Sequence, residues 1–390
     1  MKVLFIYHDF PGLGGIEKVS LLLANYFVTQ NIEVSIISAY ANPECDYSII
    51  SPNIKLVLVP EKKQLNSPVN ISFITKYIKD NQIGFIINQG FASEILKKQL
   101  PEKCKLIQVL HNLSFWEKRI IPHSIYWDDI SEASFINKIN KTRKYIFNHI
   151  FPQRKYRKIH KRYKHILENS DRFITLSDGL SQIVVNKFPE YQNIIQAIEN
   201  PTDLHIVENN ATKENEVIYA GRLHRVDKRV DRILKIWQEI EKKGTNWKLR
   251  IIGDGPDKKR LLDIANKLQL KQCTFEGYHK DVSNFLKHAK VIVLSSNIEG
   301  IPMSLIEAMQ AGVIPVVYNC SPGLERLIDN HKNGILIPCF DSKTFTNELY
   351  HLMNSPELIK QYSDAAKEKV NEFDIKIIGE KWIQLFNELT

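Results

Sequence analysis

The chain has 390 residues, with 43% apolar and 25% charged side chains, which is the composition of an ordinary globular protein. These figures exclude a fibrous or disordered chain and predict two domains of roughly 180 to 200 residues, because single cores rarely grow larger. No apolar run approaches the ~18 to 20 residues that span a bilayer, and "VLFIY" is too short for a secretory signal, so we expect a cytoplasmic protein. The five cysteines are scattered without a C-x-x-C pair, and we expect free, buried thiols.

The net charge of +9 is concentrated in one segment. Residues 138–164 hold eleven lysines and arginines and no aspartate or glutamate, so the rest of the chain is nearly neutral.

The N-terminal half alternates apolar runs with helical patterns. After "KVLFIYH" come a glycine loop, a segment whose apolar residues recur at helix spacing, and a second run, "EVSIISAY". This is the βαβ opening of a parallel sheet. Further apolar runs at 55–59, 85–88, 106–111 and 172–177 predict its inner strands.

The C-terminal half repeats this organisation after a polar stretch, "VENNATKENE", which predicts a domain boundary near residues 205 to 214. Strand patterns then alternate with helices expected at 231–243, 257–268, 282–288, 302–311, 342–354 and 356–371. We therefore expect a second doubly wound domain. A terminal helix near 375–389 has an apolar face that must pack on something.

The stretch "EGIPMSLIEAM" holds two glutamates eight residues apart. Pro302 suits the first position of a helix, so Glu299 lies in the preceding loop and Glu307 in the second turn. Their carboxylates are on the order of 10 Å apart, too far to share a metal ion, and would address opposite ends of an elongated ligand. Between them, the N–H groups of Met303 and Ser304 form an anion site. We interpret this pattern as a nucleotide-sugar site; an ordinary amphipathic helix is the alternative.

Two other loops of the C-terminal half support this interpretation. In "YAGRLHRVDKRVD", Arg222 and Lys228 precede a helix, where two cations would neutralise a departing diphosphate without a metal; exposed loop charges are the alternative. In "IIGDGP", Gly253 and Gly255 permit close approach of a base or a phosphate, although a simple tight turn has the same pattern.

Two features of the N-terminal half follow strands of the first sheet. "GLGG" at 12–15 is not G-x-G-x-x-G, and the second strand lacks a terminal acidic residue, so we do not expect NAD binding. His111 ends a strand where α/β sheets bind ligands, with a structural histidine as the alternative. No D-x-D motif is present, since Asp128 and Asp129 are adjacent, so a metal-dependent transfer has no obvious anchor.

Taken together, these residues resemble glycosyltransferase family 4, the retaining enzymes of GT-B fold. The matching pieces are "GGIEKV" at 14–19, "HN" at 111–112, "TLSDGL" at 175–180, "ENPTD" at 199–203, "AGR" with Lys228, "IIGDGP", "FEGY" and the E-x7-E element from Glu299 to Glu307. They occur in the family's order across nearly the whole chain. The chain departs from the family at Thr202, where glycine is more usual, and in its long basic insert.

The resemblance implies two Rossmann-like domains that face each other across a cleft. An acceptor-side domain would occupy 1–205, with the basic insert at about 115–168, and a nucleotide-sugar-binding domain would occupy 206–374. The terminal helix at 375–390 would pack back on the N-terminal domain.

Carried over position by position, the resemblance also assigns roles. Glu299 would hold the donor sugar, with His111 beside it; Glu307 would hold the ribose, and Arg222 and Lys228 the diphosphate. Further donor-binding residues are expected to be Gly14, Gly15, Gly253, Gly300, Ile301, Pro302, Met303 and Ser304, and acceptor-side residues Glu17, Asn112 and Ser177. The chemistry would be a front-face substitution without cofactor or metal, in which the departing diphosphate helps to deprotonate the acceptor hydroxyl.

Within "PQRKYRKIHKRYKHIL", Tyr156, Ile159, Tyr163 and Ile166 share one helical face, and basic residues surround it. A basic amphipathic helix of this kind predicts contact with an anionic membrane surface. One alternative is that the apolar face packs on the N-terminal domain and the charges are only solvated. Another is nucleic-acid binding, which no nucleic-acid fold accompanies.

We therefore expect a cytoplasmic, peripherally membrane-bound glycosyltransferase. It would move a hexose or N-acetylhexosamine from a UDP-sugar, in preference to a GDP-sugar, to a polyprenyl-diphosphate-linked glycan in the biosynthesis of a cell-surface polysaccharide such as O-antigen or capsule. The alternatives are transfer to a small soluble acceptor, and a non-catalytic α/β protein that binds a nucleotide sugar or nucleic acid.

Overall fold

The computed structural model describes the chain apart from residues 12–13, 43–45, 63, 91–93, 96, 119–138, 140–141, 143–151 and 205–211. Several sequence predictions fall outside the described residues: Asp128 and Asp129, Cys45, most of the predicted linker, and the first half of the basic segment.

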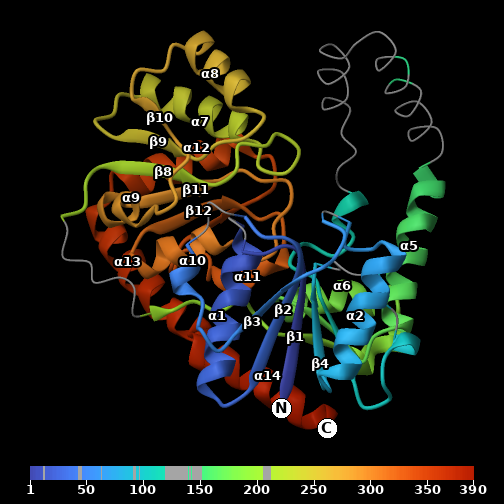
Figure 1. The fold of residues 1–390 in the computed structure, drawn as a ribbon. Coiled ribbons are helices and arrows are strands. Elements are labelled where there is room, and N and C mark those ends of the chain that lie inside the picture. The colour runs from blue at the N-terminus through green and yellow to red at the C-terminus, as the bar shows by residue number, and fades with distance from the viewer. Residues whose placement is uncertain are drawn as a thin grey trace.

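The N-terminal half forms a seven-stranded parallel sheet with the strand order β3-β2-β1-β4-β5-β6-β7 (Figure 1). Its strands are β1 (Lys2–Asp9), β2 (Glu33–Tyr40), β3 (Lys55–Leu58), β4 (Phe85–Gln89), β5 (Lys105–Val109), β6 (Arg172–Thr175) and β7 (Ile195–Ala197). The helices described in this half are α1 (Gly15–Thr29), α2 (Pro68–Asp80), α5 (Pro152–Glu168) and α6 (Asp178–Val185).

The C-terminal half forms a six-stranded parallel sheet with the order β10-β9-β8-β11-β12-β13. Its strands are β8 (Glu216–Ala220), β9 (Lys248–Ile252), β10 (Cys273–Gly277), β11 (Val291–Leu294), β12 (Ile314–Tyr318) and β13 (Ile335–Ile337). The helices are α7 (Val230–Lys242), α8 (Lys258–Lys267), α9 (Ser283–His288), α10 (Met303–Gln310), α11 (Pro322–Leu327), α12 (Ser342–Met353), α13 (Pro356–Val370) and α14 (Ile375–Leu389). Two doubly wound domains confirm the predicted fold class.

Helices cover both faces of the first sheet. Side chains alternate between these two faces along each strand. In β1, Val3 and Phe5 point into the core beneath α1, whereas Leu4 and Ile6 point into the core beneath α2. The near-continuous apolar runs of the sequence follow from this two-sided burial.

The last helix, α14, leaves the second domain and packs on the first, next to α1 (Figure 1). The ring of Phe386 lies 5.4 Å from that of Phe27 on α1 and 4.7 Å from that of Phe85 on β4. This contact accounts for the apolar face of the terminal helix, as the resemblance implied.

The chain crosses between the domains twice, and the two crossings lie side by side. Thr202 pairs with Asp374 in a parallel bridge, and its N–H donates to the carbonyl of Phe373 at 2.8 Å. Glu199 accepts from Arg326 on α11 and from Lys381 on α14. These contacts hold together the two segments that connect the domains, and we call this region the hinge.

Some element boundaries differ from the sequence predictions. Pro302 is the N-cap of α10 in an extended conformation, so the helix begins one residue later than predicted. β5 ends at Val109, two residues before His111, which lies in the loop and not on the strand. The short helices α6 and α11 and the three-residue strand β7 were not predicted, and β7 is too short to show a clear alternation.

The apolar face of α5 is buried in the N-terminal domain. Ile159 and Tyr163 pack with Phe173 and Phe188, and the Tyr163 hydroxyl accepts a hydrogen bond from the Phe115 amide at 3.0 Å. An apolar face that packs on the N-terminal domain is the alternative weighed above. The predicted contact with an anionic membrane surface stays a prediction, and it would involve the exposed basic side of α5 and not this face. Arg157, Lys158, Lys161, Arg162 and Lys164 remain exposed on the opposite side.

Cys104 and Cys320 are buried and Cys273 and Cys339 are half-buried, and none of the four forms a disulfide with another described residue. Within the described part of the chain, no helix has both the length and the apolar character needed to cross a membrane.

Candidate active site

Three loops with predicted site residues follow strands at which a sheet reverses its winding, whereas Gly253, His111 and Ser177 follow β9, β5 and β6. The strands of reversal are β1 and β4 in the first sheet and β8 and β11 in the second. Open α/β sheets bind ligands at this point, beyond the carboxyl ends of the strands. The glycines of α1 follow β1, the Arg222–Lys228 loop follows β8, and the Glu299–Ser304 segment follows β11.

Both domains line a pocket of about 380 Å³ at these loops. The first domain contributes Gly14, Gly15 and Lys18 at the start of α1. The second contributes Gly221, Arg222, Ile252, Gly253, Asp254, Tyr278, His279, Lys280, Val282, Met303, Ser304 and Glu307, among others. Many of the predicted donor-binding residues therefore surround one interdomain pocket.

Glu299 is almost fully buried and forms an ion pair with Lys228. The Lys228 Nζ lies 2.8 Å from Oε1 and 3.0 Å from Oε2, and the Ser296 hydroxyl donates to Oε1 at 2.6 Å. Burial alone would lower the pKa of Lys228, but the adjacent Glu299 carboxylate outweighs it, and the pKa is raised. The structure thus joins two predicted site residues that are 71 positions apart in the sequence.

Arg222 lies at the exposed rim of the same loop and pairs with Asp227 at 3.1 Å. Asp227 also contacts the ring of His224. Burial would raise the pKa of Asp227, but His224, Lys228 and Arg222 together hold it below its usual value. Asp227 therefore lies between the two predicted diphosphate ligands as a charged carboxylate.

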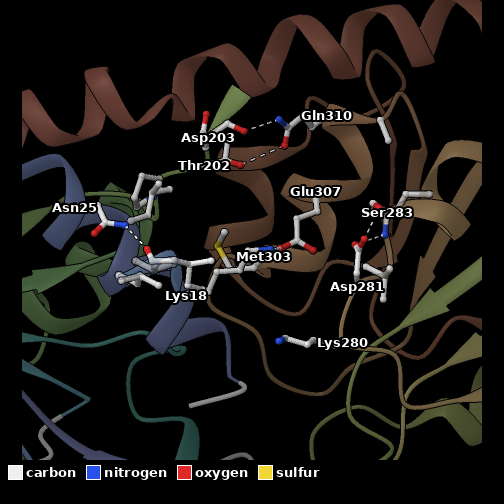
Figure 2. Close-up of a pocket in the computed structure, with 18 residues that line it drawn as sticks. Lys18, Asn25, Thr202, Asp203, Lys280, Asp281, Ser283, Met303, Glu307 and Gln310 are labelled. Carbon is white, nitrogen blue, oxygen red and sulfur yellow. Dashed lines mark hydrogen bonds and ion pairs between the residues drawn. The ribbon is translucent and has the colours of Figure 1, made fainter. Parts of the chain in front are cut away.

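Glu307 points toward Lys18 of α1, as Figure 2 shows in a close-up of a neighbouring cavity. Its Oε1 accepts from Lys18 Nζ at 2.5 Å, and the glutamate side chain is 21% exposed. The ion pair joins the two domains and forms the boundary with a second cavity of about 370 Å³ nearer the hinge. On the far side of that cavity, Gln310 donates to the Asp203 carbonyl at 2.7 Å (Figure 2).

The glycines of the second domain permit close approach between backbone segments. A methyl group on Gly253 would come within 1.9 Å of the Gly221 carbonyl oxygen, and one on Gly255 within 2.3 Å of that of Leu223. Both glycines also have φ values above +130°, which disfavour other residues. The sequence predicted close approach of a base or a phosphate here. In the structure the close neighbour is the backbone of the loop after β8, next to the pocket.

Gly300 permits the two domains to touch. A methyl group there would lie 2.1 Å from the carbonyl oxygen of His111, so the loop before α10 packs directly on the loop after β5. Beside it, the Asn200 side chain donates to the carbonyl of Ile301 at 3.4 Å. Ile301 is buried, whereas Pro302, Met303 and Ser304 are partly exposed.

The start of α1 faces the start of α10. A methyl group on Gly15 would meet the Met303 side chain at 3.4 Å, an ordinary contact. Glu17 folds back to the backbone of Gly14, in the position of a capping-box glutamate. Burial raises its pKa, and these backbone hydrogen bonds oppose the increase. Glu17 thus caps α1, which provides a structural role beside the predicted acceptor-side one.

The remaining acceptor-side predictions lie at the edge of the first domain. Ser177 is buried and caps α6, since its hydroxyl accepts from the Leu180 amide at 3.3 Å. Asn112 is exposed next to His111. Neither lines the two pockets described above.

His111 contacts Gln89, the last residue of β4, through its Nε2. Burial lowers the pKa of His111 to about 4, and the nearby Asn200 side chain opposes this shift in part. The ring is therefore neutral at physiological pH. Tyr7, at the end of β1, is fully buried beside Gln89.

Sequence reasoning missed four residues that organise the site. They are Ser296 and Asp227, which hold the charged residues of the second domain, and Gln89 and Tyr7, which surround His111. Asp227 is adjacent to Lys228 in the sequence, but no spacing pattern identified it as a site residue. Within the described residues there is no group of three or more His, Cys, Asp or Glu side chains arranged to hold a metal ion.

Comparisons with known proteins agree with this geometry. A family model described as Glycosyltransferase Family 4 matches residues 13–206, and one described as Glycosyl transferases group 1 matches residues 201–369. A solved structure of S. aureus TarM in complex with fondaparinux, alpha-GlcNAc-glycerol and UDP superimposes with a TM-score of 0.72, covering 99% of each chain at 14% identity. At this identity the likeness shows the fold, which is GT-B.

Two relatives by sequence are also glycosyltransferases. One, from Haemophilus influenzae and called an uncharacterized glycosyltransferase, is 28% identical over 98% of each chain. The other, from Campylobacter jejuni, is named GalNAc-alpha-(1->4)-GalNAc-alpha-(1->3)-diNAcBac-PP-undecaprenol alpha-1,4-N-acetyl-D-galactosaminyltransferase; it is 28% identical over 54% of this chain and 60% of its own. The chain belongs to the GT-B glycosyltransferases of the family 4 type.

Proposed function

We propose that this glycosyltransferase moves a hexose or N-acetylhexosamine from a UDP-sugar to a hydroxyl of a lipid-linked glycan, with retention at the anomeric carbon. The observation that carries the proposal is the interdomain pocket. In it, the start of α10 and the cation Arg222 face the start of α1, and the buried pair of Lys228 and Glu299 belongs to the same loops.

The donor's three parts can be assigned to residues that line this pocket or belong to its loops. The diphosphate would lie at the first amides of α10, which precede the helix's own hydrogen-bond ladder, with Arg222 and Lys228 beside it. Glu307 would accept the ribose hydroxyls, and Glu299 the hydroxyls of the sugar. UDP is our preferred nucleotide over GDP because the TarM structure holds UDP in the same fold.

In the transfer step, the bond between the anomeric carbon and the diphosphate oxygen breaks, and a bond to the acceptor oxygen forms on the same face of the sugar. The proton of the acceptor hydroxyl passes to the departing diphosphate. Arg222 and Lys228 stabilise the negative charge that develops on this leaving group, so no metal ion is needed in the proposal. His111, on the opposite wall, would face the sugar.

The acceptor side of the proposal rests on two observations. The C. jejuni relative bears a name that specifies an undecaprenol-linked substrate. The exposed side of α5 carries Arg157, Lys158 and Lys161, which form no ion pair with another described residue, and such clusters attract anionic lipid surfaces. Because the apolar face of α5 is buried, contact with the inner face of the cell membrane would be electrostatic and would weaken with salt.

A panel of nucleotide sugars tests the donor half of the proposal. We expect nucleotide release from one UDP-sugar in the presence of acceptor, undiminished by EDTA, with the product anomer identified by NMR as that of the donor. Release abolished by EDTA would contradict the metal-free mechanism, and an inverted product would contradict retention. Binding of a nucleotide sugar without release under any acceptor would favour the non-catalytic alternative.

Vesicle co-sedimentation tests the acceptor half. With vesicles containing anionic lipid, we expect the wild type to sediment and a triple variant, Arg157→Gln, Lys158→Gln and Lys161→Gln, to remain in solution. The control is a triple substitution of exposed lysines on the second domain, Lys242→Gln, Lys259→Gln and Lys267→Gln, which removes equal charge. Full activity of the α5 variant with a soluble acceptor, together with unchanged sedimentation, would favour transfer to a small soluble acceptor.

A further inference from the structure

Three neighbouring side chains at the carboxyl edge of the first sheet each have a buried polar atom without a hydrogen-bond partner among the described residues. The atoms are Tyr7 Oη, Gln89 Nε2 and His111 Nδ1. Tyr7 and Gln89 are both 3% exposed, and β1, β4 and β5, which lead to the three residues, are consecutive in the sheet. Only one other described side-chain atom, Glu117 Oε2, is left in this state, and it lies beside α5.

Unpaired buried atoms are unusual in native proteins, where each costs about 1 to 3 kcal/mol. The side-chain amides of Asn88 on β4 and Gln108 on β5 show the usual arrangement, because Asn88 donates to Gln108 at 2.8 Å in the core. Three open polar atoms are therefore unusual for this sheet, and they lie at the edge where open α/β sheets bind ligands.

The contact between Gln89 and His111 decides how the imidazole is protonated. A carbonyl oxygen only accepts hydrogen bonds, so the ring nitrogen that meets Gln89 Oε1 carries the proton. Because burial keeps the ring neutral, the other nitrogen, Nδ1, holds a lone pair. The open atom of His111 is thus a hydrogen-bond acceptor.

We propose that Gln89 is a positioning residue that fixes His111 in the Nε2–H tautomer, so that Nδ1 accepts a hydrogen bond from the ligand. It follows that the ligand group facing His111 is a donor, such as a hydroxyl or an amide N–H, and not an ether or carbonyl oxygen. The identity of that ligand as a sugar rests on the proposed function; the tautomer itself does not.

The surroundings of the ring contain few groups that would compete with Gln89. The side chains that act on the imidazole are Gln89 and Asn200, both neutral. Asn200 is the one competitor, because its hydrogen bond raises the pKa of the ring and therefore favours a proton on the nitrogen that it contacts. On the neighbouring elements, Glu17 of α1 faces Tyr7, and Glu299 precedes Gly300, whose backbone packs on the His111 carbonyl. Replacing Gln89 with glutamate would place a charge directly on Nε2, where the native protein has none.

The first test reads the tautomer directly. In protein labelled with ¹⁵N-histidine, the His111 signals are assigned by their loss in His111→Gln. At neutral pH we expect one protonated nitrogen, Nε2, in the wild type, and a loss of this preference in Gln89→Leu. A wild-type ring protonated at Nδ1, or a tautomer unchanged in Gln89→Leu, would overturn the proposal. This readout needs no enzymatic activity, so it separates failure of the proposal from failure of the proposed function.

The second test uses the pH profile of kcat/KM. Gln89→Glu should raise the pKa of His111 into the assay range, so that protonation turns Nδ1 into a donor and kcat/KM falls about tenfold as the pH is lowered from 8 to 6. The wild type should not show this fall. The control is Gln108→Glu, which places a carboxylate on β5 of the same sheet. Equal profiles in both variants would overturn the proposal. If Gln89→Glu fails to fold, the tautomer in Gln89→Leu decides.

Discussion

The two domains hold the polar groups of the candidate site in opposite states. On the second domain, Lys228, Glu299 and Ser296 satisfy one another, with contacts between 2.6 and 3.0 Å. On the first domain, Tyr7 and His111 keep atoms open.

The difference follows from the cost of burial. An unpaired buried charge costs several kcal/mol, so the buried charges of the second domain must pair with one another in the absence of the ligand. A neutral polar atom costs about 1 to 3 kcal/mol, which a folded domain can tolerate until a ligand pairs with it. We infer that the second domain supplies preorganised charge and the first supplies hydrogen-bond specificity.

The largest effect should come from breaking the buried ion pair of the second domain with Lys228→Ala. The leaving group loses a cation, so we expect kcat to fall about 10²- to 10³-fold. Glu299 would also remain buried without its counter-ion, which should cost about 3 to 5 kcal/mol in the free energy of unfolding. Steady-state kinetics and urea denaturation measure the two effects.

The matched control is Lys242→Ala, which removes an exposed ion pair to Glu239 on α7. We expect less than about 1 kcal/mol in stability and an unchanged kcat. A Lys228→Ala variant that raises KM alone, with normal turnover, would show that the cation does not act on the leaving group.

A smaller effect, confined to binding, is expected for Glu307→Ala. Loss of the ribose contact should raise the Kd of the donor about 10- to 100-fold while kcat changes less than about threefold. Isothermal titration with the nucleotide measures the affinity.

Lys18→Ala separates the ribose contact from the interdomain ion pair, because it removes the partner of Glu307 and keeps the carboxylate. The lysine side chain is 61% exposed, so we expect little change in stability and a small change in affinity. If Lys18→Ala weakens donor binding as much as Glu307→Ala, the ion pair and not the ribose contact is the important interaction.

Gly300→Ala tests whether the direct contact between the loop before α10 and the loop after β5 is required. The added methyl group would lie 2.1 Å from the His111 carbonyl oxygen, so the loops must separate, at a cost of about 1 to 3 kcal/mol. We expect a lower melting temperature and a lower kcat/KM. Gly84→Ala is the control, because its methyl group would meet its nearest neighbour at an ordinary 3.6 Å. Equal behaviour of the two variants would contradict the contact.

The smallest effect concerns the hinge and depends on pH. Burial would raise the pKa of Glu199, but Lys381 and Arg326 outweigh it and hold the pKa below its ordinary value of 4.5. Since the folded state binds the proton less tightly than the unfolded state, this stabilisation is present at neutral pH and is lost as the pH falls below about 4.5.

Glu199→Gln should therefore lower the free energy of unfolding by about 1 to 2 kcal/mol at pH 7. The difference between variant and wild type should shrink as the pH is lowered toward 3. Urea denaturation at both pH values measures it, and a difference that stays constant would assign the effect to packing.

Local spacing was enough to place the candidate site residues of the second domain in loops between strands and helices. Glu299, Glu307, Arg222 and Lys228 lie in loops between strong strand and helix patterns, so their placement follows from the alternation of elements. The direct pairing of Lys228 with Glu299 could not be predicted, because only the sheet brings together the loops after β8 and β11.

The open polar atoms of the first domain were harder to predict from the sequence. Tyr7 and Gln89 end apolar runs that predict buried strands, and nothing in such a run distinguishes a packed side chain from one with an open polar atom. For Gly253, the sequence indicated close approach of a base or a phosphate, whereas the neighbour in the structure is a backbone carbonyl 32 residues earlier at Gly221.

The central claim is that Arg222, Lys228 and the start of α10 hold the donor's diphosphate. The most direct test compares the affinities of UDP and UMP by isothermal titration, with EDTA present throughout. We predict that UDP binds the wild type about ten times more tightly than UMP or better, and that this ratio falls below about three in an Arg222→Gln, Lys228→Gln double variant. Equal affinities in the wild type, or a ratio that survives in the double variant, would contradict the account.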